Sequence, residues 1–193
     1  AQRALCAGAY MRNQFPFVGL RAPERRRLAT QALADLPAPN EAQLATTARL
    51  LWQQPEREFQ YVGCDLLAEH VAVAGPGFID VVHELVVVKS WWDTVDAVAA
   101  HTVGPLVRRH RELTSVMDDW VRSGDLWVAR AAILHQLDEQ ILFRGEVLVE
   151  GGPPDVRLGR DICMGRLCIL ELAKELCRSA SSRVPRFWNR YPI

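Results

Sequence analysis

Near the middle of the chain, Trp92 and Asp96 have side chains that could do chemistry together. Ser90 and Asp93 match the start of a helix with a capping box, and side chains four residues apart in a helix lie on one face. Trp92 and Asp96 should therefore point the same way, and Trp91 should point elsewhere. A carboxylate beside an indole ring combines negative potential with an aromatic face, and both favour a positive charge. Spacing alone leaves the alternative of a core tryptophan pair with a solvated aspartate.

Length and charge set broad limits on the protein. The chain has 193 residues, of which 49% are hydrophobic, and its formal net charge is zero. This length suits one domain or one array of repeats. A nucleic-acid-binding face would need its basic residues gathered on one side. Nearly all of these residues are arginines, which suit bidentate phosphate contacts, although GC-rich codon usage would produce the same excess.

Several other kinds of site have no support in the sequence. The five cysteines form no CxxC pair and the five histidines have no ligand spacing, so we expect free thiols in a reducing cytoplasm and no metal. Residues 75–77 are not followed by the Gly-Lys-Ser/Thr of a phosphate loop. No apolar run is long enough to span a membrane, and no signal peptide opens the chain. We expect no cofactor and no membrane partner.

The whole chain has the pattern of helix after helix, with no convincing strand. Pro23 opens one helix, Asn40 with Gln43 caps the next, and Asp125 caps a later one. Helical pairs separated by Gly/Pro breaks recur roughly every 35–40 residues, which favours an all-α repeat array with a concave face. The expected helices cover residues 1–14, 23–36, 40–53, 56–73, 78–88, 90–104, a short segment around 108–111, 112–122, 126–137 and 138–149. In the helix at 56–73, the expected apolar face is Phe59, Val62, Leu66 and Leu67.

Four segments within the first 140 residues form a more specific pattern. They are YMRNQFPFVG with a following PER (10–19 and 23–25), EFQY (58–61), KSWWDTVD (89–96) and WVARAAILHQL (127–137). Together they resemble the alkylpurine DNA glycosylases, DNA alkylation repair enzymes built from HEAT-like repeats. The resemblance implies an α-solenoid with a concave DNA-binding face. It also favours a functional site at Trp92 and Asp96 over the core tryptophan pair.

The resemblance implies a reaction and roles for four residues. The enzyme would hydrolyse the N-glycosidic bond of positively charged purines, such as 3-methyladenine and 7-methylguanine, without flipping the base into a pocket. Asp96 would stabilise the oxocarbenium ion, and Trp92 would pack on the sugar or backbone. Arg130 would contact a phosphate, and Tyr10 is a candidate wall of the same cleft. The structural alternatives are a helix-stabilising aspartate, a solvated arginine and a buried tyrosine.

Further basic residues are candidates for contact with double-stranded DNA, the expected partner. Arg25 lies in the run 25–27, and Arg108 and Arg109 form a second cluster. Such clusters are often solvated faces without a partner, so this alternative stays open. We expect a monomer that acts on DNA in the nucleoid region of the cytoplasm.

The resemblance stops near residue 140. We expect residues 1–150 to form the repeat array and residues 151–193 to form a divergent C-terminal helix and tail of the same domain. The break at 151–154 precedes a helix at about 161–178, and Trp188 lacks the context of the second cleft tryptophan that the family would bring. The divergent end keeps open a second function, a non-catalytic helical scaffold that binds DNA or protein.

Overall fold

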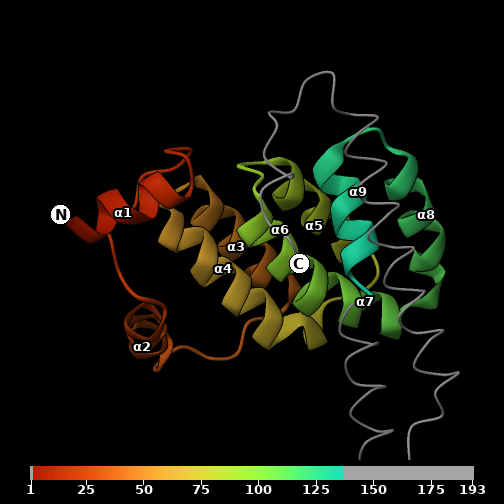
Figure 1. The fold of residues 1–193 in the computed structure, drawn as a ribbon. Helices are drawn as coiled ribbons and strands as arrows, with labels where there is room; N and C mark the ends of the chain where they lie inside the picture. Colours follow the sequence, from red (N-terminus) through yellow and green to blue (C-terminus); the bar gives the residue numbers. More distant parts are fainter. Residues whose placement is uncertain (1, 137–193) are drawn as a thin grey trace, which may run out of the picture.

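The computed structural model describes residues 2–136, and every regular element within them is helical (Figure 1). The prediction of an all-α solenoid is confirmed for this part of the chain. The predicted helix at 138–149, the break at 151–154, the helix at 161–178 and Trp188 lie outside the described residues. The elements are α1 (Gln2–Tyr10), α2 (Ala22–Leu33), α3 (Glu41–Gln53), α4 (Arg57–His70), η1 (Val71–Val73), α5 (Phe78–Val87), α6 (Trp92–Val98), η2 (Ala99–Val103), α7 (Gly104–Arg109), η3 (Arg111–Leu113), α8 (Thr114–Arg122) and α9 (Leu126–Leu134).

The helices stack in two layers. Successive repeats contribute α4, α6 and α9 to one layer, where α6 contacts both neighbours. Helices α3, α5 and α8 pack behind them, since α3 contacts α4 and α5, and α8 contacts α9. Helix α2 lies at one edge of the stack and touches it through α4 (Figure 1). This arrangement places residues from three repeats side by side on α4, α6 and α9.

A continuous apolar core joins the two layers. At one point in it, the indole nitrogen of Trp52 donates to the carbonyl of Leu85 at 3.0 Å. A Cβ added at Gly63 would lie 2.6 Å from the Trp52 ring, so this glycine allows α3 and α4 to pack closely. Fully buried members of the core include Leu44, Leu67, Phe78, Val82, Val98, Leu106 and Val128.

Most predicted helix starts are confirmed. Asn40 and Gln43 form the expected reciprocal capping box, Asp125 accepts from two backbone N–H groups of α9, and α2 has Pro23 in its first turn. The predicted box at Ser90 and Asp93 is wrong, because the Ser90 hydroxyl donates to the Val86 carbonyl and Asp93 pairs with another helix. Helix α6 begins at Trp92 without a side-chain cap.

The predicted end of the tryptophan-bearing helix at residues 104–105 is also wrong. The chain continues from α6 through the wide π-helical turn η2 directly into α7, which begins at Gly104. A proline lacks the N–H of a regular helical turn, and a local π-turn is one way to absorb that loss. A Cβ on Gly104 would lie 2.6 Å from the His135 carbonyl oxygen, so the glycine lets α7 pack against the end of α9.

Two further differences concern the first helices. Helix α1 ends at Tyr10, earlier than predicted, because Arg12 and Asn13 have positive φ angles of 57° and 56°. On α4, Leu66 and Leu67 are buried as expected, but Phe59 is 37% exposed. The first turn of α4 instead buries polar residues, which are described below with the site.

Candidate functional site

An ion pair links Asp96 on α6 to Arg130 on α9. The Arg130 guanidinium donates through Nε to one carboxylate oxygen at 2.6 Å and through Nη2 to the other at 2.7 Å. The side chain of Asp96 is 35% exposed, and that of Arg130 is 19% exposed. The carboxylate is therefore fixed in direction by a bidentate contact, and solvent still reaches it.

Trp92 contacts Tyr10, which α1 brings from the start of the chain. The two rings meet edge to face, with centroids 6.1 Å apart and planes at 80°. Tyr10 is 71% exposed, which excludes the alternative of a buried tyrosine. We call Tyr10, Trp92, Asp96 and Arg130 the Asp96 group. It draws on α1, α6 and α9, and Trp92 and Asp96 are one helical turn apart on α6.

Trp91 points to a different neighbour, as its position in the sequence predicted. Its ring lies 5.8 Å from that of Trp127 on α9, with the planes at 41°. Trp127 is partly buried and packs against the core. The two adjacent tryptophans therefore have separate surroundings, and only Trp92 belongs to the Asp96 group.

A buried polar network at the first turn of α4 was not predicted. Arg57 is fully buried, and its guanidinium binds both carboxylate oxygens of Asp93, at 3.1 Å from Nε and 2.6 Å from Nη2. Tyr61 donates its hydroxyl to the same carboxylate at 2.6 Å. Burial, followed by the charge of Asp93, raises the pKa of Tyr61 far above its usual value. The phenol therefore remains a hydrogen-bond donor to Asp93.

The same turn of α4 holds the segment after α1. The Glu58 carboxylate accepts from the backbone N–H groups of Val18, Gly19 and Leu20 at 3.0, 2.7 and 3.2 Å. Gly19 has a φ of 95°, which a residue with a Cβ rarely adopts. These contacts anchor the loop that joins α1 to α2.

The sequence contained a weak signal for this network. Glu58 and Tyr61 are part of the EFQY segment, and Asp93 is part of KSWWDTVD. Their pairing could not be predicted, because nothing in the sequence places the start of α4 against α6. A buried arginine needs a partner, and only the packing of these two helices identifies it as Asp93.

The other basic candidates lie on α2 and α7, whereas the Asp96 group lies on α1, α6 and α9. Arg25 pairs with Asp65 at 2.9 Å, and its guanidinium lies 4.9 Å from the Tyr61 ring centre. Arg109 donates to the carbonyls of residues 71 and 74, next to η1. Arg108 is half-buried, and its Nη1 has no hydrogen-bond partner in the described part of the chain. These arginines thus lie around α2, α4 and α7, and their contact with DNA stays a prediction.

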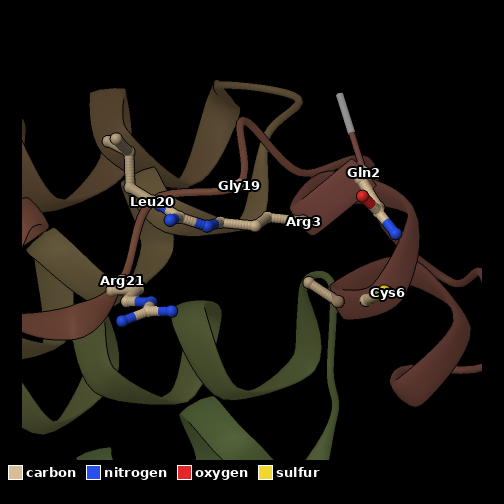
Figure 2. A pocket seen from close by; sticks show the side chains of 7 residues that line it. Gln2, Arg3, Cys6, Gly19, Leu20 and Arg21 are labelled. Carbon is tan, nitrogen blue, oxygen red and sulfur yellow. The ribbon is translucent and has the colours of Figure 1, made fainter.

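A hollow of about 380 Å³ lies between α1 and the loop residues that precede α2 (Figure 2). In Figure 2 the Arg3 side chain extends from α1 toward Leu20. The hollow contains no member of the Asp96 group; its lining residues are Gln2, Arg3, Cys6, Ala7, Gly19, Leu20 and Arg21. Within residues 2–136, no three His, Cys, Asp or Glu side chains are placed to hold a metal ion. No helix in this range is long and apolar enough to cross a bilayer.

Comparisons with known proteins agree with the architecture. A family model described as DNA alkylation repair enzyme matches residues 1–140. A solved structure, described as a predicted DNA alkylation repair enzyme from Enterococcus faecalis, is 25% identical, with a TM-score of 0.67 over 96% of this chain and 96% of that chain. A comparison with curated proteins gives no match. Because the family model covers more than half of its length, this chain belongs to the DNA alkylation repair enzyme family.

Proposed function

We propose that this protein is a DNA glycosylase that hydrolyses the N-glycosidic bond of positively charged alkylated purines in duplex DNA. The observation that carries the proposal is the Asp96 carboxylate, which is 35% exposed, held in direction by Arg130, and one helical turn from Trp92. The membership of a DNA alkylation repair family supports the same assignment. The substrates would be 3-methyladenine and 7-methylguanine.

The chemistry needs little acid catalysis, because alkylation at N3 or N7 already gives the base a positive charge. When the bond to deoxyribose breaks, the electron pair leaves with the base, which becomes neutral, and the sugar becomes an oxocarbenium ion. Water then adds to the anomeric carbon and loses a proton to solvent. Asp96 would stabilise the cation and position this water, because a fixed carboxylate acts most strongly on charge that develops beside it.

The aromatic members of the Asp96 group would add to this stabilisation. The face of Trp92 would pack on the sugar, where it attracts the developing positive charge. Tyr10 meets Trp92 edge to face and is largely exposed, so it would form the adjoining wall of the site. This arrangement would act on the damaged nucleotide without an enclosed base pocket.

Arg130 would have two tasks in this proposal. Through Nε and Nη2 it orients Asp96, and a phosphate of the damaged strand would bind to the same positive group. Arg25, Arg108 and Arg109 would contact further phosphates, so binding would depend on salt and not on sequence. We propose that the protein acts as a monomer in the nucleoid region of the cytoplasm.

The decisive experiment is base release from duplex DNA methylated at purine nitrogens, with the free bases identified by mass spectrometry. A glycosylase releases 3-methyladenine or 7-methylguanine and leaves abasic sites. A protein that binds duplex DNA and releases no base would instead be a non-catalytic helical scaffold.

A further inference from the structure

We propose that Arg57 and Tyr61 are positioning residues that set the direction of Trp92 and Asp96 by holding Asp93, which lies between them on α6. The inference rests on the proposed glycosylase function for its consequence on rate. Neither residue belongs to the Asp96 group, and both act through Asp93.

The contacts fix the first turn of α6 at several points. One guanidinium binds both oxygens of Asp93, the Thr94 hydroxyl at 2.8 Å and the Lys89 carbonyl at 2.8 Å. The Tyr61 hydroxyl adds a third donor to Asp93. These bonds have fixed directions, so together they limit rotation of α6 about its own axis and sliding along α4. Trp92 and Asp96 flank Asp93 on this short helix, and their positions follow from the same contacts.

The first turn of α4 also holds the other side of the site. The Phe15 ring lies 3.9 Å from the Arg57 guanidinium carbon, and the Arg57 backbone N–H donates to the Pro16 carbonyl at 2.9 Å. Glu58 holds the next residues of this segment. This segment begins at Phe15, shortly after Tyr10 in the chain, so α4 contacts both α6 and the loop that follows α1.

A purely structural role would not require this kind of contact. Burying an ion pair carries a desolvation cost that apolar residues of similar volume avoid, so its distinct contribution is a defined geometry. Geometry matters for catalysis, because a displacement of about 1 Å can lower a rate by roughly 100-fold. The contacts with Arg57 and Tyr61 lie at the first turn of the helical run that continues from α6 through the π-turn into α7, where they set the position of its start.

The test uses two variants that keep bulk. Tyr61→Phe keeps the ring beside Arg25 and removes only the donor to Asp93, whereas Arg57→Lys replaces the planar fork with one ammonium group. Phe59→Leu, on the same turn of α4 and exposed, is the matched control. The measurements are single-turnover base release, affinity for unmodified duplex, and hydrogen exchange of residues 92–98 compared with α8.

We expect Tyr61→Phe to slow base release about 3–10-fold and Arg57→Lys about 10–100-fold, with duplex affinity within about twofold of the parent. Exchange should rise at residues 92–98 and not in α8. In an Asp96→Asn background both changes should slow release by a smaller factor than in the parent, because the part of their effect that passes through Asp96 is already lost. Phe59→Leu should resemble the parent. If Arg57→Lys does not fold, the results for Tyr61→Phe alone decide the test.

Two results would overturn the inference. One is a parental release rate with unchanged exchange at residues 92–98. The other is an equal slowing in the Asp96→Asn background, which would mean that the effect does not pass through Asp96. If the parent itself releases no base, the proposed function fails, and exchange still decides: a rise confined to residues 92–98 supports the positioning role, and no rise overturns it.

Discussion

Asp96 and Arg130 lie 34 residues apart in the sequence and form a bidentate ion pair between α6 and α9. The pair ties two successive repeats together at the point where the carboxylate remains open to solvent. A carboxylate that faces a polyanion repels phosphate, and its arginine partner offsets that repulsion. The pair therefore lets a negative charge lie close to DNA until positive charge develops on the sugar.

Removing the charge of Asp96 should separate catalysis from binding. We expect Asp96→Asn to leave duplex affinity unchanged or slightly higher and to slow base release about 10–1000-fold, which corresponds to roughly 1.4 kcal/mol for each factor of ten. The reason is that the carboxylate interacts more strongly with the transition state than with undamaged DNA. Single-turnover release of 7-methylguanine beside a binding titration checks this. Release at the parental rate would show that Asp96 is not the catalytic carboxylate.

Truncating Trp92 should impair both binding and catalysis. The ring supplies contact area to the DNA as well as an aromatic face for the cation, so Trp92→Ala should weaken duplex affinity and slow base release together. Trp120→Phe is a useful comparison, because this buried tryptophan lies on α8 outside the Asp96 group. A Trp92→Ala protein with parental rate and affinity would remove this residue from the site.

Changing Arg130 should alter the salt dependence of DNA binding. If Arg130 contacts one phosphate, Arg130→Ala should weaken duplex binding and lower the slope of log affinity against log salt by about 0.9. Arg130→Lys should keep the charge but slow base release, because an ammonium group cannot replace the two parallel hydrogen bonds that the guanidinium donates to Asp96. Arg122→Ala, at an exposed pair with Asp119, is the control that should leave the slope unchanged.

Breaking the buried pair between Arg57 and Asp93 should lower the free energy of unfolding more than breaking an exposed pair. Arg57→Ala leaves Asp93 buried without its cation, so we expect the free energy of unfolding to fall by about 3–5 kcal/mol. Arg49→Ala breaks an exposed pair with Glu84 and should lower it by only about 0–1 kcal/mol. Urea denaturation of the parent, Arg57→Ala and Arg49→Ala measures this difference in the free energy of unfolding. Equal losses for the two variants would contradict the assigned burial of Arg57.

The thiol of Cys64 should make stability fall at alkaline pH. Burial raises the pKa of Cys64 to about 12 from an ordinary value of 9.0. Below pH 9 the Cys64 thiol is protonated in both the folded and the unfolded protein, so its titration does not lower the free energy of unfolding there. Above pH 9 the unfolded thiol loses its proton first, and stability should decline by about 1.4 kcal/mol per pH unit until the folded thiol also ionises. Comparing unfolding of the parent and Cys64→Ala at pH 8 and pH 10 isolates this slope.

The sequence by itself determined the local architecture, because helix starts and apolar periodicity depend on residues close together in the chain. Asn40 with Gln43 and the cap at Asp125 were predictable for that reason. That Trp91 and Trp92 point in different directions was also expected from local sequence, although Trp91 precedes α6 in extended backbone. The same local logic failed at Ser90 and Asp93, since a capping box competes with partners that only tertiary contact supplies.

Only the tertiary structure decided which distant residues meet. Three contacts join separate helices: the ion pair of Arg57 with Asp93, the ring contact of Tyr10 with Trp92, and the ion pair of Arg130 with Asp96. An exposed arginine and a buried one look alike in a sequence, because both are compatible with a helical pattern. Their difference arises from the stacking of α4, α6 and α9, which removes water from Arg57 and leaves Asp96 partly open to it.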